Sequence, residues 1–268
     1  MQGKTYVPKS VQRHKISLIH YAIAKTALAI GLLLPMTAFA LHPLVTEDTG
    51  VQGQNNWQFE FNSDRAVERD TKFTSLSVNA TLTYGLTDAL DVAFNAPWER
   101  NQIGNYPSQF QRGAGDASIF MKWRIYEDEK LSFAVKPILY LPTGNFDKGL
   151  GNDRTRPGLI GVTTWGDEEF SLSANIGYTY NDNKVGDRKS IWNTSGAMLV
   201  GLADKLRGAL EIGAYTNGDA ASHKNPAFAN VGLIYSPTDK LDLDIGYKRG
   251  LNDAESLYSF GAGVTVRW

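Results

Sequence analysis

Apolar and polar residues alternate with a period of two over most of this chain. A strand points successive side chains to opposite faces, whereas the apolar face of a helix recurs about every 3.6 residues. The alternation is clearest in the stretch LDLDIGYK, where Leu243 and Ile245 share one face and Asp242 and Asp244 share the other. This pattern predicts an all-β protein.

The alternating segments form twelve candidate strands, most of them 8–12 residues long. They cover residues 57–62, 75–84, 90–95, 117–126, 131–141, 156–165, 170–180, 191–202, 206–216, 227–236, 241–248 and 257–268. Short turns alternate with longer polar connections at 98–115, 142–155, 181–190, 217–226 and 249–256. An even number of strands, each close to the ~9–11 residues that a tilted strand needs to cross a bilayer, is typical of outer-membrane barrels. We therefore predict a single 12-stranded antiparallel transmembrane β-barrel over residues 56–268.

Residues 1–40 have the composition of an export signal. They contain five basic and no acidic residues and end in the apolar run TALAIGLLLPMTAFA. A helix needs about 20 apolar residues to span a bilayer, and this run is shorter. It closes on an A-x-A cleavage site formed by Ala38 and Ala40. We predict a cleaved Sec-type signal peptide; an N-terminal anchor or a buried helix is the alternative.

The alternation alone does not say which face of the strands lies inside, because a soluble lipocalin-type barrel buries its apolar face. Here the apolar faces carry almost no charge, whereas the opposite faces carry charges of both signs. Buried charge is tolerated only beside water or ion-pair partners. Aromatic residues at strand ends match the girdles of outer-membrane barrels: Trp57, Tyr84, Trp123, Tyr180, Trp192, Tyr235, Tyr247 and Trp268. We expect lipid outside; a secreted β-sandwich is the alternative.

Ten charged residues are expected to line the lumen: Glu60, Asp91, Lys122, Arg124, Lys136, Glu211, Asp242, Asp244, Lys248 and Arg267. The acids among them come mainly from strands near the chain ends, and three bases come from the fourth and fifth strands. An acidic wall facing a basic one would favour polar or zwitterionic solutes; ion pairing that stiffens the barrel is the alternative. Small inward residues favour open volume, namely Ser75, Ser77, Thr81, Ser173, Asn175, Ser195, Gly232, Gly261 and Gly263.

Two segments are candidates to narrow this lumen. Eight strands enclose an interior filled by side chains and sixteen to eighteen leave a water channel, so twelve predict a narrow or plugged pore. Residues 41–55 lack periodicity and would either plug the lumen or hang in the periplasm. The Gly-rich loop 141–158 is a candidate constriction, with Asp153, Arg154 and Arg156 as its charged tip.

The composition excludes several kinds of protein. The absence of Cys rules out a disulfide scaffold, a thiolate metal site and a cysteine nucleophile. A net charge of −1 argues against nucleic-acid binding. We identify no cofactor motif and no metal site, since Glu47 and Asp48 read as two solvated acids in a turn-like stretch. Ser222 and His223 are adjacent and would point apart on an extended chain, which makes them a poor catalytic dyad.

Four stretches carry a family resemblance: HPLVTEDTGVQG, YGLTDALDVAFNAPWE, GAGDASIFMKWR and LPTGNFDKGLG. Together they resemble the outer-membrane, transporter-like barrels of the meta-pathway phenol-degradation family, over residues 42–268. The resemblance implies a Gram-negative outer-membrane barrel that takes up small, aromatic or hydrophobic compounds. It supplies no catalytic or ligand residues.

The sequence thus predicts a non-enzymatic channel for passive uptake of a small-molecule solute through a narrow polar lumen. Its expected partners are outer-membrane lipid and the barrel-assembly machinery, which would read the C-terminal stretch VTVRW ending at Trp268. Two alternatives remain: a structural or adhesive barrel whose loops bind a partner, and an outer-membrane hydrolase.

Overall fold

The computed structural model describes residues 42–69, 74–102, 110–184 and 186–268. The expected signal peptide, including Ala38 and Ala40, lies outside the described residues. The strands are β1 (Trp57–Val67), β2 (Thr74–Thr87), β3 (Leu90–Gln102), β4 (Phe110–Ala114), β5 (Ser118–Glu127), β6 (Leu131–Tyr140), β7 (Arg156–Gly166), β8 (Phe170–Tyr180), β9 (Ser190–Ala203), β10 (Leu206–Tyr215), β11 (Ala227–Thr238), β12 (Leu241–Gly250) and β13 (Tyr258–Arg267). The described residues include one short 3-10 helix, η1 (Phe146–Lys148), and no helix long and apolar enough to cross a membrane.

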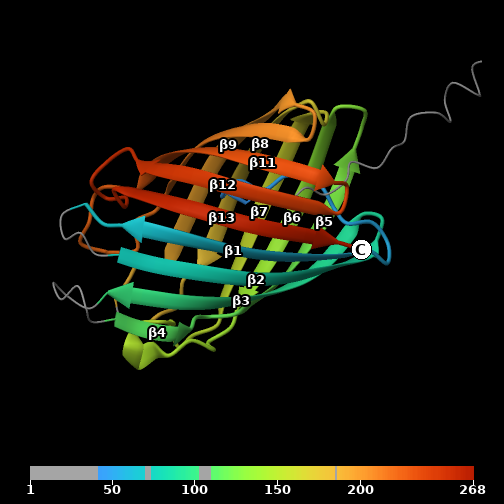
Figure 1. Ribbon diagram of the computed structural model, residues 1–268. Helices are drawn as coiled ribbons and strands as arrows, with labels where there is room; N and C mark the ends of the chain where they lie inside the picture. Colours follow the sequence, from blue (N-terminus) through green and yellow to red (C-terminus); the bar gives the residue numbers. More distant parts are fainter. Residues whose placement is uncertain (1–41, 70–73, 103–109, 185) are drawn as a thin grey trace, which may run out of the picture. The chain divides into compact units, whose positions relative to one another are not determined.

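The strands close into one antiparallel barrel (Figure 1). β1 pairs with β13 on one side and with β2 on the other, so the first and last strands seal the ring. β4 and β5 both pair with β3, at residues 98–102 and 90–95, and therefore act as one interrupted strand. The thirteen hydrogen-bonded segments thus form the predicted twelve-stranded barrel. Among the described residues, every strand except the short β4 is paired along both sides, which avoids the open edges that a lipid environment would penalise.

One predicted connection is largely strand. Residues 98–115 were expected to be a loop, but β3 continues to Gln102 and β4 occupies Phe110–Ala114. After Trp98 the sequence ERNQ is polar on both faces, so it gives no apolar alternation. This end of the strand carries the long connections of the barrel, and a strand that meets water on both sides needs no apolar face.

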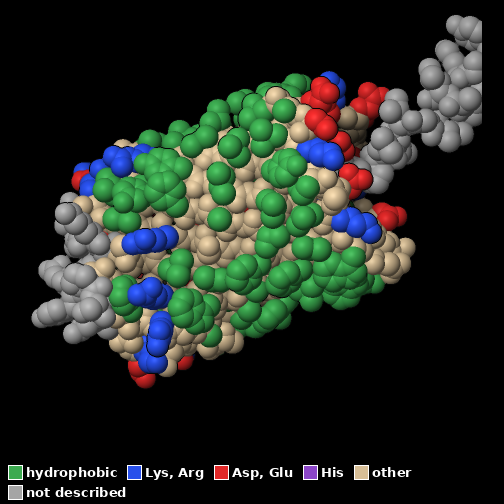
Figure 2. All heavy atoms as spheres, in the orientation of Figure 1, with side chains coloured by type: hydrophobic (Ala, Val, Ile, Leu, Met, Phe, Trp, Pro, Cys, Tyr) green, Lys and Arg blue, Asp and Glu red, His purple; other side chains and the backbone are tan. Residues whose placement is uncertain are grey.

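The apolar faces point outward. Leu243 and Ile245 are 43% and 58% exposed, whereas Asp242 and Asp244 are only 1% and 5% exposed. In β7, where the sequence did not favour either face, Trp165 is outward and Thr164 is buried. Figure 2 shows hydrophobic side chains spread along the length of the visible face, with charged ones gathered at its two ends. A barrel with an apolar outer surface is suited to contact with lipid and not with water.

Aromatic side chains gather at both ends of the barrel. At the short-turn end, the ring of Trp57 lies 4.6 Å from that of Tyr84 and 6.4 Å from that of Trp268. At the long-loop end, the rings of Tyr178 and Trp192 are 4.9 Å apart. Two such belts are the arrangement expected where rings meet lipid headgroups.

Asp116 organises the long connection between β6 and β7. Its carboxylate accepts hydrogen bonds from the backbone N–H of Gly144 at 3.0 Å and of Asn152 at 2.9 Å. A Cβ on Gly144 would lie 2.3 Å from the carbonyl oxygen of Leu150, so only glycine fits there. The stretches GAGDAS and LPTGNFDKGLG therefore form one packed unit at the long-loop end.

Candidate functional site

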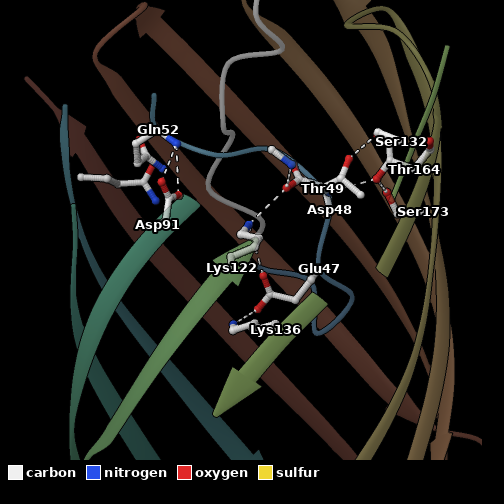
Figure 3. Close-up of polar contacts among 12 residues, drawn as sticks. Glu47, Asp48, Thr49, Gln52, Asp91, Lys122, Ser132, Lys136, Thr164 and Ser173 are labelled. Atoms are coloured by element: carbon white, nitrogen blue, oxygen red, sulfur yellow. Dashed lines mark hydrogen bonds and ion pairs between the residues drawn. The ribbon is translucent and has the colours of Figure 1, made fainter. Parts of the chain in front are cut away.

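Residues 42–52, here called the lumen segment, lie inside the barrel before the chain turns into β1. Figure 3 shows them passing between the walls, with side chains directed at several different strands. Their partners lie on β1, β3, β5, β6, β7, β9, β10, β11 and β12. The lumen segment, residues 42–52 of the stretch 41–55, therefore crosses the bore.

The start of the lumen segment fits against a patch of inward glycines. A Cβ on Gly246 or Gly232 would lie 2.3 Å or 2.4 Å from the ring of Pro43. A Cβ on Gly263 would lie 2.8 Å from the imidazole of His42. The expectation that such small residues leave open volume is therefore wrong for Gly232 and Gly263, because the lumen segment fills the space beside them, whereas Gly261 still borders a cavity.

Leu44 anchors the lumen segment through an apolar contact. Its side chain is buried in a cluster with Ala197, Leu199, Ala209 and Ile234, which lie on β9, β10 and β11. Ile234 is wholly buried although it belongs to a barrel wall. Burying a leucine side chain contributes roughly 1.5–3 kcal/mol. The contact therefore favours a docked segment over a free one.

Glu211 of β10 binds the backbone of the same segment. Its carboxylate accepts the N–H of Val45 at 3.0 Å, and both the N–H and the hydroxyl of Thr46 at 2.6 Å and 2.7 Å. Asn230 of β11 adds a fourth donor at 3.1 Å. A buried carboxylate with this many donors is well stabilised.

The middle of the lumen segment places two acids against two wall lysines. Glu47 pairs with Lys136 of β6 and lies 3.5 Å from Lys122 of β5. Asp48 lies 3.4 Å from the same Lys122. Burial raises the pKa of Glu47, but the two ammonium groups outweigh it and lower the pKa to about 2. In the described part of the chain, no three His, Cys, Asp or Glu side chains are grouped as a metal ion would require.

The segment then runs towards β3. The N–H of Thr49 donates to the hydroxyl of Thr164 at 3.1 Å, and its own hydroxyl pairs with that of Ser132. The N–H of Gln52 donates to Asp91 at 3.0 Å (Figure 3). Polar wall residues thus satisfy the segment at each step, in place of the secondary structure it lacks.

A cavity of about 290 Å³ remains between the lumen segment and one side of the wall. Its wall side is formed by β1, β2, β3, β5 and β6. Asn62, Asn79 and Asn95 line it as a chain of amides, joined by hydrogen bonds of 3.3 Å and 3.5 Å. Phe120 and Tyr140 line it as well. The cavity therefore combines hydrogen-bonding and aromatic surfaces.

Two further cavities adjoin the lumen segment. One of about 280 Å³ shares His42, Leu44 and Val45 with the first cavity and includes Ser75 and Ser77 of β2. The other, of about 450 Å³ and at the short-turn end, shares Gln52 with the first. The remaining space thus follows the lumen segment along the bore.

The ten charged residues expected in the lumen are distributed between the lumen segment and wall partners. Glu60 faces the 290 Å³ cavity, while Asp91, Lys122, Lys136, Glu211 and Asp244 contact the lumen segment. Arg267 pairs with Asp242 at 2.7 Å, Lys248 with Glu255 at 3.3 Å, and Arg124 with Glu127 at 3.1 Å. Local ion pairs therefore neutralise much of the predicted separation into an acidic and a basic wall.

The charged residues of the expected constriction loop pair with residues of neighbouring connections. Asp153 pairs with Lys184, and Arg154 lies 3.8 Å from Asp182, all in exposed connections. Arg156 begins β7 and lies 3.4 Å from Asp116. The structure brings these three residues together with the neighbouring loop, and their role as a constriction stays a prediction.

The pair considered for a hydrolase belongs to a turn. The hydroxyl of Ser222 accepts a hydrogen bond from the side chain of Asn217 at 2.9 Å and donates to the carbonyl of Lys224 at 3.3 Å. These contacts give Ser222 a structural role between β10 and β11.

The residues that contact the lumen segment were only partly evident in the sequence. Its main contacts are made by His42, Leu44, Thr46 and Thr49, which lie in the family-like stretch HPLVTEDTGVQG, but that stretch does not indicate which wall residues they meet. A second signal was present: inward glycines recur on three consecutive strands, β11, β12 and β13. Such clustering indicates that another piece of backbone packs there.

Residues 43–268 match the sequence model of a family described as "Putative MetA-pathway of phenol degradation". The match covers nearly all of the described chain. The chain belongs to this family. No curated protein sequence gives a significant match.

Solved structures show the same fold. An outer membrane channel from Pseudomonas putida F1 has a TM-score of 0.62 at 16% identity, covering 82% of this chain and 97% of the other. The NanC porin gives 0.54 at 12% identity, covering 78% of this chain and 98% of the other. The KdgM porin gives 0.53 at 8% identity, with 78% and 98% covered. These structural neighbours are channels and porins.

Proposed function

We propose that this family member is an outer-membrane channel through which small compounds enter passively. The observation that carries the proposal is the cavity of about 290 Å³ between the lumen segment and a polar wall, inside a barrel whose outer face is apolar. An apolar exterior suits acyl chains and a polar interior suits water. The sequence contains no nucleotide-binding motif that would couple transport to energy.

The proposed path follows the three adjoining cavities past the lumen segment. This segment is the main constriction, because it crosses the bore and is held at both ends and in the middle. The free space is at the lower end of what a drug-sized ligand occupies, roughly 300 Å³. Solutes about the size of a single ring are therefore favoured over oligomers.

The lining supports a solute that has both an apolar ring and a polar group. Phe120, Ile138 and Tyr140 offer an apolar surface, and the asparagine chain offers donors and acceptors. The family description adds phenol degradation as a setting for such a solute. We propose small hydroxylated or carboxylated aromatics as the substrate class.

Reconstitution tests the channel directly. Purified protein in planar bilayers should give small discrete conductance steps, and liposomes that contain it should swell in solutes of single-ring size. Thr81→Trp places an indole in the cavity and should reduce both signals, whereas Thr163→Trp, outside that cavity on β7, should not. Wild-type barrels that pass neither ions nor small solutes would refute the proposal.

We also propose that β13 carries the assembly signal. Its outward residues Phe260 and Val266 alternate with small or polar inward ones, and Trp268 closes the chain. Deleting Trp268 should lower the amount of heat-modifiable barrel recovered from outer membranes. Unchanged recovery would remove the role of this residue in assembly.

A further inference from the structure

Glu47 binds between two lysines of the wall. Its carboxylate pairs with Lys136 and lies 3.5 Å from Lys122, whose side chains are only 9% and 12% exposed (Figure 3). The lysines belong to neighbouring paired strands, whereas Glu47 belongs to a segment without regular structure. The partners of this ion pair are therefore held differently: the cations by strands of the barrel, the anion by a segment without regular structure.

The same lysines border the 290 Å³ cavity. Phe120, Ile138 and Tyr140 lie on it beside them, and the Lys136 ammonium is 4.0 Å from the centroid of the Phe120 ring. A carboxylate at the position of the Glu47 carboxylate would thus have an apolar surface next to it. A benzoate-like molecule has this combination of groups, with the ring and the carboxylate directly joined.

Removing Glu47 without a replacement is costly. An ammonium group with little exposure loses its hydration and needs a counter-charge, and removing one partner of such a pair is strongly destabilising. Asp48 lies 3.4 Å from Lys122, but it is on the same segment and would leave with it, whereas Glu60 and Asp91 stay on the wall near Lys122 and offset only part of the loss. An anionic solute can supply the missing charge, so its binding and the departure of Glu47 are thermodynamically linked.

We propose that Glu47 occupies the binding site for the carboxylate of a small aromatic acid. The acid binds Lys122 and Lys136 and displaces Glu47 from them. This inference rests on the proposed function and deepens it, since binding of the solute would itself displace the segment that narrows the pore. Specificity follows from the lysine pair for the acid group and from Phe120, Ile138 and Tyr140 for the ring.

Calorimetric titration of the detergent-solubilised protein tests the binding step, with benzoate as the probe and benzamide as its neutral isostere. Glu47→Gln removes the competing charge and should tighten benzoate binding by about tenfold, while benzamide binding stays unchanged. Glu47→Asp keeps the charge with a shorter reach and should fall between, which tests the idea even if the glutamine variant folds poorly. Lys136→Met should abolish the preference for benzoate.

Exposed residues in the turn between β5 and β6 supply matched controls. Glu129→Gln and Lys130→Met make the same chemical changes away from the lumen and should leave benzoate binding as in the wild type. Heat-modifiable mobility on gels checks that every variant is folded. Equal binding of benzoate and benzamide in the wild type, Glu47→Gln and Lys136→Met would overturn the inference.

Permeation separates this inference from the proposed function. In bilayers, Glu47→Gln should shift the reversal potential towards anion selectivity, and the wild type should pass benzoate faster than benzamide. A wild type that conducts, but passes both probes equally in all variants, would overturn the inference and leave the channel intact. Tight, lysine-dependent benzoate binding in a barrel that never conducts would refute the channel and keep the binding site.

Discussion

The two sides of the lumen wall differ in what they face. The side formed by β9–β13 receives the lumen segment against glycines and the cluster around Leu44. The side formed by β1–β6 keeps longer polar and aromatic side chains and faces the cavity. Both sides carry small or polar inward residues in the sequence, yet the lumen segment packs closely against the glycines of the first side, whereas the cavity of about 290 Å³ separates it from much of the second. We call them the packed side and the open side, although a cavity of about 280 Å³ also remains beside Gly246 and Gly261.

This difference teaches how an inward glycine should be interpreted. On the packed side, Gly232 and Gly246 are paired neighbours on β11 and β12, and Pro43 lies against both. On the open side, the small residue Thr81 lies next to Asn79 on the inward face of β2 and opposite Asn95 of β3, and all three line the cavity. A patch of glycines therefore marks a place where backbone docks, whereas scattered small residues among longer ones mark free space.

Filling the glycine patch should have the largest effect on this contrast. In Gly246→Val even the Cβ would lie 2.3 Å from Pro43, so the start of the lumen segment must move away from β12. We expect conductance in planar bilayers to rise severalfold, because the main constriction is displaced. Gly161→Val is the matched control, since its Cβ would meet Ile176 at an ordinary 3.7 Å. Unchanged conductance in a folded Gly246→Val barrel would show that the segment does not restrict the pore.

Truncating the apolar anchor should have the next largest effect. Leu44→Ala removes a side chain that is 9% exposed and should weaken docking by about 2–3 kcal/mol. The neighbouring Val45→Ala removes a side chain that is 61% exposed and should change little. Limited proteolysis of the purified barrel measures the difference, with the segment cut faster in Leu44→Ala. Equal cleavage of the two variants would mean that the cluster does not hold the segment.

Alkaline pH should release the start of the lumen segment, which His42 holds. Burial lowers the pKa of His42, but hydrogen bonds and charge from Asp244 on β12 and Asp64 on β1 outweigh it and raise the pKa to about 9. Lys248 of β12 lines the cavity of about 280 Å³ together with His42, and its positive charge opposes the rise in the pKa of His42. A raised pKa means that the imidazolium favours docking fully below the free value near 6.5, and that this contribution is lost as the pH rises through 9.

Conductance should therefore rise between about pH 7 and pH 9.5 in the wild type. His42→Gln cannot titrate and should show a higher, flat conductance over that range. The loss of one proton weakens docking by at most about 1.4 kcal/mol for each pH unit, so the opening should be gradual rather than abrupt. A wild-type profile identical to that of His42→Gln would eliminate His42 as a latch.

The strands could be predicted from the sequence because lipid enforces alternation. Every strand that crosses the apolar layer needs an apolar outer face, as Leu243 and Ile245 show. The prediction failed for Phe110–Ala114, where the strand carries no apolar alternation. The loop unit around Asp116 was also missed, since its bonds to Gly144 and Asn152 join residues far apart in sequence.

The lumen was harder to predict than the barrel. Inward charges such as Asp91 and Lys122 follow from the period of two, but their partners do not. Those partners lie on residues 42–52, which form no regular structure and therefore leave no periodic pattern. Only the three-dimensional bore brings Glu47 to Lys136, across 89 positions of the chain.

The smallest expected effect is on the open side, at Asn79. Its amide donates to Asn62 and Ser77 at 3.3 Å, and it accepts from Asn95 at 3.5 Å, all of which are long bonds. Long, partly exposed hydrogen bonds contribute little, so Asn79→Ala should change the free energy of unfolding by no more than about 0.5–1 kcal/mol.

The same substitution should widen the cavity, because Asn79 lines it. Conductance should increase by less than that of Gly246→Val, since the lumen segment stays docked. Val78→Ala, one residue along β2 on the opposite face, should leave conductance unchanged. If Asn79→Ala instead lowered conductance or unfolded the barrel, the asparagine chain would be a structural element like the glycine patch, and the two sides of the wall would differ less than their packing indicates.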